Sequence, residues 1–319
     1  MYEELQALDH VRINFNEGGL LALNITLGII MFGVALGIKI QGFKTVFLKK
    51  PKTLLVGLFS QFIALPAFTF LLVLLIHDYI TTSIALGMIL VAAAPGGNIS
   101  NFISSLAKGS IELSVSLTAI ATLGAVILTP FNFVFWGGLY IKYAERVDGN
   151  MLLRDIVIDN AQMFQSVFIL LGIPLILGML FAWKLPNITE KIKKPIQTIS
   201  VMIFMLFIII AFAKNYGIFI LYIKWITVIV FIHNFLALLT GFSIASLFGI
   251  KRRERRSITI ETGIQNSGLA LVLLFNPNIF PEVLPLGGMM FIAAWWGIWH
   301  MISGLGLSYF FSKIPLKRF

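Results

Sequence analysis

The stretch Ala94-Pro95-Gly96-Gly97-Asn98-Ile99-Ser100-Asn101 lies inside a hydrophobic segment that runs from about Ile84 to Leu106. Proline removes a backbone donor, and glycine weakens the helix that such a segment would otherwise form. Within a bilayer, every backbone group freed in this way is costly unless protein, water or a ligand satisfies it. The stretch therefore predicts a broken helix that is buried or lines a cavity.

A second polar interruption, Glu261-Thr262-Gly263-Ile264-Gln265-Asn266-Ser267-Gly268, lies in the hydrophobic segment from about Ser257 to Phe275. One interruption alone is more often a kink that packs against neighbouring helices. Two interruptions that contain Asn, Ser, Gln and a carboxylate favour the broken helices that form the binding site of a transporter.

The composition is that of a membrane protein. Of the 319 residues, 58% are hydrophobic and 12% are charged, whereas about a quarter of the residues in a soluble domain are charged. The net charge is +10, but the basic residues gather at the ends of apolar runs, which is how membrane orientation is encoded. We therefore expect the lipid bilayer, and no nucleic acid, as the partner. The absence of cysteine excludes disulfides, thiolate metal sites and a cysteine nucleophile.

Nine apolar segments are long enough to cross a bilayer as helices. They cover about residues 19–38, 53–76, 84–107, 113–136, 160–182, 196–213, 217–248, 257–275 and 284–311. With the N-terminus outside, 18 lysines and arginines lie on the inner side and 6 on the outer side. This bias predicts a multi-pass protein of the cell inner or plasma membrane with its C-terminus in the cytoplasm. No dimer interface is evident.

The two interrupted segments are the third and the eighth. An odd offset of five turns a repeated unit upside down in the membrane, so that spans one to four correspond to spans six to nine. We therefore expect an all-α polytopic protein with an inverted repeat and two discontinuous helices that meet near the midplane.

Glu261 is the polar residue that most needs an explanation. A carboxylate within a span is costly unless it is paired or hydrated. Lys224 interrupts only the start of the segment at 217–248, and no other lysine or arginine lies within the neighbouring apolar segments to offer a partner. A bound cation or a proton is therefore expected there. The alternative is a solvated ion pair with Arg255 and Arg256 near the cytoplasmic surface. The Ser, Thr, Asn and Gln residues near the interruptions offer the oxygen ligands that hard cations prefer.

The two interruptions, together with Leu113-Ser114, resemble the bile acid:sodium symporter family. The similarity extends from Gly28-Ile29-Ile30-Met31-Phe32-Gly33 to Trp299-His300 and includes both bacterial homologues and the nine-span animal bile acid carriers. It implies a single transporter domain, residues 1–319, with two parts. A core (about 53–136 and part of 217–311) that contains the crossed helices moves against a panel (about 19–38 and 160–213), which gives alternating access.

The resemblance further implies two sodium ions behind the helix crossing and an organic anion in front of it. The first ion would be held by Ser100, Asn101, Ser114, Thr118 and Glu261. The second would be held by Gln61, Glu261, Gln265 and the backbone around Thr262 and Ile264. The anion would bind near Asn98, Asn266 and the half-helix N-termini, where helix dipoles favour negative charge, with His300 as a further candidate.

This sequence departs from the bacterial pattern at some of these positions. Where bacterial members commonly read Trp-His-Asn, it has Trp299-His300-Met301, so one polar contact is missing. At Asn98 and Thr262 this sequence resembles the animal members of the family, whereas many bacterial members have a different residue at each of these positions.

We therefore expect a sodium-coupled symporter, not an enzyme, that imports a bile-acid-like anion or a small carboxylate. The nearer alternative is a proton-coupled or uncoupled carrier or exporter of the same fold. The other is an intramembrane hydrolase that uses Ser303 near His300, but no nucleophile-elbow pattern or orienting carboxylate accompanies these residues.

Overall fold

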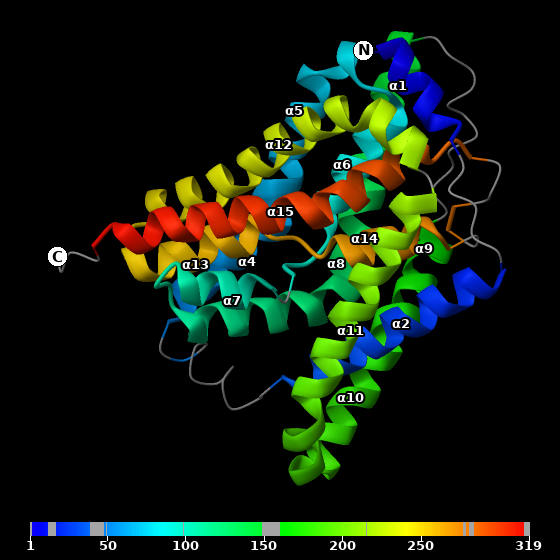
Figure 1. The fold of residues 1–319 in the computed structure, drawn as a ribbon. Coiled ribbons are helices and arrows are strands. Elements are labelled where there is room, and N and C mark those ends of the chain that lie inside the picture. The colour runs from blue at the N-terminus through cyan, green and yellow to red at the C-terminus, as the bar shows by residue number, and fades with distance from the viewer. Residues whose placement is uncertain are drawn as a thin grey trace.

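The computed structural model describes residues 2–11, 17–38, 48, 50–97, 99–148, 160–214, 216–276, 279–280 and 284–315 (Figure 1). Within these ranges the regular structure is helical, apart from one isolated β-bridge. In chain order the elements are α1 (Tyr2–Asp9), α2 (Glu17–Leu36), α4 (Pro51–Phe59), η1 (Ser60–Ala64), α5 (Leu65–Leu75), η2 (His77–Tyr79), α6 (Thr82–Ala93), α7 (Ile99–Leu106), α8 (Ile111–Asp148), α9 (Asn160–Val167), η4 (Phe168–Gly172), α10 (Ile173–Lys184), α11 (Pro186–Lys214), α12 (Tyr216–Leu247), α13 (Arg252–Gly263), α14 (Ser267–Leu274) and α15 (Gly287–Lys313).

Five helical stretches of the described residues are long and apolar enough to cross a membrane. They are Pro51–Leu75, Ile111–Val147, Ala161–Lys184, Ile220–Leu247 and Gly287–Lys313. Shorter apolar helices cover Ile25–Leu36 and Thr82–Ala93. The prediction of an all-helical, multi-pass membrane protein is confirmed, while the count of nine spans and the inverted repeat stay predictions.

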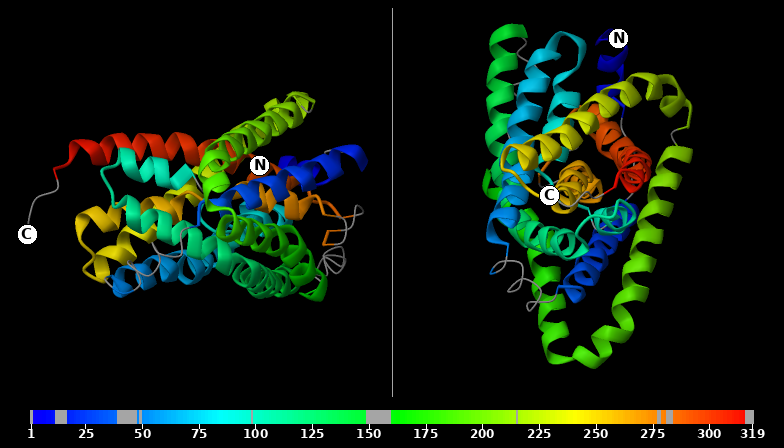
Figure 2. Two further views of the ribbon diagram at one scale, coloured as in Figure 1. Left: turned by 90° about the horizontal axis from the view of Figure 1, so that it is seen from below. Right: turned by 90° about the vertical axis from the view of Figure 1, so that its left-hand side faces the viewer.

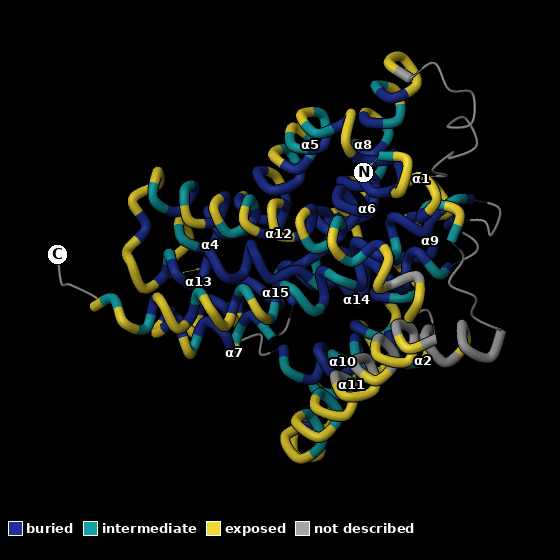
Figure 3. The backbone as a smooth tube through the Cα atoms, turned by 45° about the horizontal axis from the view of Figure 1, so that its top comes forward, coloured by how far each residue is buried: buried dark blue, intermediate teal, exposed yellow. Residues whose placement is uncertain are grey.

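Helices α2, α10 and α11 form one group. They pack against one another at one side of the molecule, at the lower right of Figure 1. In the right-hand view of Figure 2, α11 and α4–α5 lie on opposite sides of the bundle that contains α13 and α15. Every residue of α6 and α14 is buried, so these two short helices form the interior, whereas the long helices expose much of their length (Figure 3).

Two of the long stretches contain a π-helix just before a proline. Helix η1 leads into α5, whose second residue is Pro66, and η4 leads into α10, whose second residue is Pro174. Because a proline ring cannot fit against an unbroken α-helical turn, the wider π-turn accommodates it. Helix η1 contains Gln61, which is fully buried, so this irregular turn places a polar side chain in the interior.

Helix α1 packs across the first residues of α6 and α15. Its Leu5 and Leu8 are fully buried, and a Cβ added at Gly288 would lie 2.5 Å from Asp9 Oδ1. The Oδ1 atom of Asp9 accepts a hydrogen bond from Thr81 Oγ1 at 3.0 Å, and Thr81 is the N-cap of α6. Burial raises the pKa of the Asp9 carboxyl from 3.8 to about 7.

The raised pKa of Asp9 predicts a pH dependence of stability. The folded state retains this proton up to about pH 7, whereas the unfolded chain releases it near pH 3.8, so the free energy of unfolding falls as pH rises between these values. Asp9→Asn removes the titration and should flatten this part of the curve. Thermal unfolding at about pH 5 and about pH 8 checks this, and the same pH dependence in both proteins would contradict it.

Candidate functional site

The two predicted interruptions are present and lie against each other. Residues 94–98 separate α6 from α7, and residues 264–266 separate α13 from α14. Gly96 and Gln265 form an isolated antiparallel bridge between them. The breaks are therefore not separate kinks but one joint structure.

Backbone hydrogen bonds join the two breaks. The N–H of Gly97 donates to the C=O of Ile264 at 2.7 Å, and the N–H of Asn266 donates to the C=O of Pro95 at 2.8 Å. Groups that lost their helical partners are thus satisfied across the junction, as buried backbone requires. At Gly97 an added Cβ would lie 3.2 Å from the Gln265 carbonyl oxygen, so glycine allows this close approach.

Side chains from other helices satisfy the last carbonyl before each break. Thr129 Oγ1 on α8 donates to the Ala93 C=O at 2.8 Å, and Asn234 Nδ2 on α12 donates to the Gly263 C=O at 2.8 Å. Both side chains are buried. The ends of α6 and α13 are therefore held in place from outside the broken segments.

Glu261 is buried, with 2% of its surface exposed, and hydroxyl groups surround its carboxylate. Its Oε2 accepts hydrogen bonds from Ser100 Oγ at 2.6 Å and Ser114 Oγ at 3.0 Å, and its Oε1 accepts one from Thr118 Oγ1. Ser114 and Thr118 lie one turn apart on α8, on the same face of that helix. Hydroxyls near both oxygens can stabilise the charged carboxylate, because each can donate its hydrogen to it.

The cluster around Thr118 contains more acceptors than hydrogens. Its Oγ1 lies within hydrogen-bond distance of Asn101 Oδ1 (3.2 Å), the Ser114 C=O (3.0 Å) and Glu261 Oε1. A hydroxyl has a single hydrogen to donate, so these oxygens exceed what one proton can join. An oxygen-rich, donor-poor cluster suits a hard cation.

The alternative of a solvated ion pair at Glu261 disagrees with the structure. Arg255 donates to Ser246 Oγ at 3.1 Å, and Arg256 donates to the C=O groups of Ala107 and Ile314 at 2.9 and 2.7 Å. Both guanidinium groups are thus engaged away from a carboxylate that is itself buried.

A second group of polar atoms adjoins the first. Both polar atoms of Gln61, the hydroxyl of Thr262 and Oε1 of Gln265 are buried and have no hydrogen-bond partner among the described residues. Such groups cost about 1–3 kcal/mol each when nothing satisfies them. The Nε2 atom of Gln265 donates to the Thr262 C=O at 2.8 Å, while the C=O of Ile264 is already used by the bridge between the breaks.

Gly96 borders both groups of polar atoms. A Cβ added at this glycine would lie 2.7 Å from Glu261 Oε1 and 2.9 Å from Gln61 Nε2. The missing side chain therefore leaves a space between the carboxylate and the unpaired amide. Among the described residues no group of three His, Cys, Asp or Glu is placed to hold a metal ion, so the ligands available here are neutral oxygens and one carboxylate. That set fits an alkali or alkaline-earth cation better than a transition metal.

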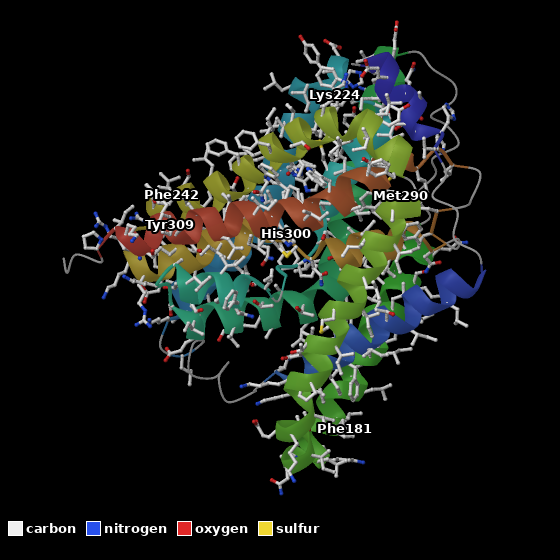
Figure 4. All side chains as sticks on the ribbon, in the orientation of Figure 1. Phe181, Lys224, Phe242, Met290, His300 and Tyr309 are labelled. Atoms are coloured by element: carbon white, nitrogen blue, oxygen red, sulfur yellow. The ribbon has the colours of Figure 1, made fainter. Side chains whose placement is uncertain are left out.

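The predicted anion ligands are less fully defined. Asn98 lies outside the described residues. Asn266 is partly exposed, and its Oδ1 accepts the Leu269 N–H at 3.1 Å, which makes it the N-cap of α14. His300 lies about midway along α15 (Figure 4), and its buried Nδ1 has no partner among the described residues. Ser303 Oγ lies within hydrogen-bond distance of Asn234 Oδ1 (2.6 Å) and of the His300 C=O (3.2 Å), so it is not paired with the imidazole as a hydrolase would require.

Sequence reasoning assigned no role at this site to Thr129, Ser104 or Asn234. Ser104 Oγ lies 3.2 Å from Ser114 Oγ, and its position four residues after Ser100 is a usable signal. Thr129 and Asn234 are polar residues within apolar segments, which is also a usable signal. Nothing in the sequence, however, pairs them with the carbonyls that they cap.

The sequence of the chain is similar to those of several known proteins. The model of the Sodium Bile acid symporter family matches residues 24–221, well over half of the chain. The "Uncharacterized sodium-dependent transporter YocS" of Bacillus subtilis (strain 168) is 28% identical over 300 residues, which cover 93% of this chain and 84% of that protein. The "Hepatic sodium/bile acid cotransporter" of Rattus norvegicus is 28% identical over 291 residues, 89% of this chain and 75% of that protein. The "P3 protein" of Mus musculus is 27% identical over 229 residues, and the match covers 71% of this chain but 45% of that protein.

Proposed function

The chain belongs to the sodium bile acid symporter family, and on this premise we propose that it is a sodium-coupled symporter that imports an organic anion. The observation that supports this most strongly is the buried Glu261 carboxylate, which accepts three hydroxyl hydrogen bonds beside the junction of two broken helices. A buried carboxylate that has no cationic side chain beside it among the described residues requires a bound cation or a proton. The names of two relatives, a sodium-dependent transporter and a sodium/bile acid cotransporter, favour sodium.

Two sodium ions bind behind the junction in this proposal. Oxygens of Ser100, Asn101, Ser114, Thr118 and Glu261 hold the first ion. Gln61, Gln265, the other side of the Glu261 carboxylate and the backbone at Thr262 and Ile264 hold the second. The unpaired buried atoms of Gln61 and Gln265 support the second set, because a cation would satisfy their oxygens.

The organic anion, a bile-acid-like molecule or a small carboxylate, binds in front of the junction. The N-termini of α7 and α14 each carry the positive end of a helix dipole, which attracts a negative group. Asn98 and Asn266 lie at those N-termini in the sequence, and His300 is the third proposed contact. Because the junction joins the two sites through backbone hydrogen bonds, sodium bound behind it orders the anion site in front.

In this proposal, transport follows from movement of the panel against the core. The panel is formed by α2, α10 and α11, which pack on one another, and the core contains both broken helices. In this proposal nine spans, with the N-terminus outside and the C-terminus in the cytoplasm, form an inverted repeat that opens to each side in turn. Two sodium ions with tenfold gradients supply about 1.4 kcal/mol each, and one net charge that enters at 100 mV supplies about 2.3 kcal/mol. A total of roughly 5 kcal/mol concentrates a monoanion on the order of a thousandfold.

Uptake into proteoliposomes tests the proposal. Thermal stabilisation against a panel of bile acids, steroid sulfates and small carboxylates, with and without sodium, first identifies an anion that binds the folded protein. Uptake of that anion, radiolabelled, should then rise severalfold when an inward sodium gradient is imposed. Equal uptake with and without the gradient would contradict sodium coupling, and uptake that follows a proton gradient instead would favour the proton-coupled alternative.

A further inference from the structure

Asn234 joins the second break to two long helices. It lies on α12 with 1% of its surface exposed. Its Nδ2 donates to the Gly263 C=O at 2.8 Å, and its Oδ1 accepts from Ser303 Oγ on α15 at 2.6 Å. A carbonyl can only accept and a hydroxyl is free to donate, so the two partners fix the orientation of the amide. Gly263 stands between Thr262 and Ile264, whose backbone belongs to the proposed second sodium site.

Helix α12 is also packed tightly behind the same turn. A Cβ added at Gly263 would lie 2.2 Å from Leu238 Cδ2, and one added at Gly241 would lie 2.9 Å from the Ile258 carbonyl oxygen and from Thr262 Cβ. Asn234, Leu238 and Gly241 recur at helical spacing, so they lie on one face of α12. That face supports the end of α13, and Asn234 supplies the hydrogen bond in it.

We propose that Asn234 is a positioning residue for sodium: it fixes the Gly263 carbonyl, and through it the Thr262–Ile264 turn, so that the affinity for sodium depends on the Ser303–Asn234–Gly263 chain of hydrogen bonds. This inference rests on the proposed sodium coupling. Groups that orient ligands in this way, without touching the ion, typically change metal affinity by about 10–100-fold when they are removed.

The neighbouring residue provides a matched control. His233 Nε2 and Thr69 Oγ1 lie 2.9 Å apart, and both side chains are fully buried. This bond joins α12 to α5 and does not reach the break. Thr69→Val therefore removes a buried hydrogen bond of the same helix without disturbing Gly263, and separates a loss of stability from a loss of sodium affinity.

The experiment is a sodium titration of the melting temperature of the full-length purified chain, with choline chloride to hold the ionic strength constant. Asn234→Leu should require about tenfold more sodium, or more, for half-maximal stabilisation. Ser303→Ala should shift the midpoint in the same direction by less, because Asn234 keeps its bond to Gly263. Thr69→Val should lower the melting temperature in choline and leave the sodium midpoint unchanged.

The outcomes separate this inference from the proposed function. A stable Asn234→Leu protein with the wild-type sodium midpoint would overturn the positioning role and leave sodium coupling intact. If Asn234→Leu does not fold, Ser303→Ala decides, and an unchanged midpoint in that variant overturns the role. A wild-type protein that sodium does not stabilise would overturn the proposed function, and this inference with it.

Discussion

Glu261→Ala is expected to abolish sodium-driven uptake while the protein stays folded. An attraction between unit charges about 4 Å apart is worth about 4 kcal/mol at an effective dielectric constant of 20, so loss of the carboxylate should weaken sodium binding on the order of a thousandfold. Folding should tolerate the change because it removes a buried charge. Thr118 Oγ1 also has another acceptor, the Ser114 C=O at 3.0 Å.

Two further variants test whether the negative charge of Glu261 is what matters. Glu261→Gln keeps the size of the side chain and should also lose sodium-driven uptake. Glu112→Gln, at an exposed position at the start of α8, removes a carboxylate outside the site and should behave as wild type. Uptake in proteoliposomes and sodium-dependent melting are measured on all three. A wild-type sodium response in Glu261→Ala would remove this residue from the site.

Gly96→Ala should have the second largest effect. Its methyl group would lie 2.7 Å from Glu261 Oε1 and 2.9 Å from Gln61 Nε2, in the space that both proposed sodium sites border. The backbone cannot easily move away, since Gly96 is bridged to Gln265. We expect a loss of about 1–3 kcal/mol in stability from overpacking and at least a tenfold rise in the sodium concentration for half-maximal uptake.

Gly306→Ala is the matched control for this substitution. It lies in α15, where an added Cβ meets no atom within 4 Å, and alanine favours a helix by up to about 1 kcal/mol over glycine. This variant should keep the wild-type sodium response and melt at the same temperature or higher. Sodium-dependent uptake of the two alanine variants is measured side by side. The prediction would be contradicted if Gly96→Ala, like Gly306→Ala, reached half-maximal uptake at the wild-type sodium concentration.

Local sequence signals predicted much of the fold. Proline, glycine and polar residues in otherwise apolar segments located both interruptions, at residues 94–98 and 264–266, because few physical arrangements tolerate them in lipid. The spacing of Ser114 and Thr118 placed them on one face of their helix, and the isolated carboxylate of Glu261 indicated a buried charge that needs neutralising. Together these signals located the candidate site.

Other features depend on contacts between distant segments. The π-turn that turns Gln61 inward, the bridge from Gly96 to Gln265, and the capping of the breaks by Thr129 and Asn234 each involve atoms that no local pattern relates. Periodicity reports which face of a helix is polar, but it does not report which carbonyl that face will meet. That the two breaks come together was suggested by the inverted-repeat plan and by the resemblance to a known family, not by a local pattern.

Equilibrium binding of radioactive sodium to the purified protein tests most directly whether the oxygens around Glu261 hold sodium. Wild-type protein should bind the ion saturably, unlabelled sodium should displace it while potassium does so poorly, and Glu261→Ala should bind none above background. Equal sodium binding by the wild-type and Glu261→Ala proteins, or none by a folded wild-type protein, would contradict this assignment.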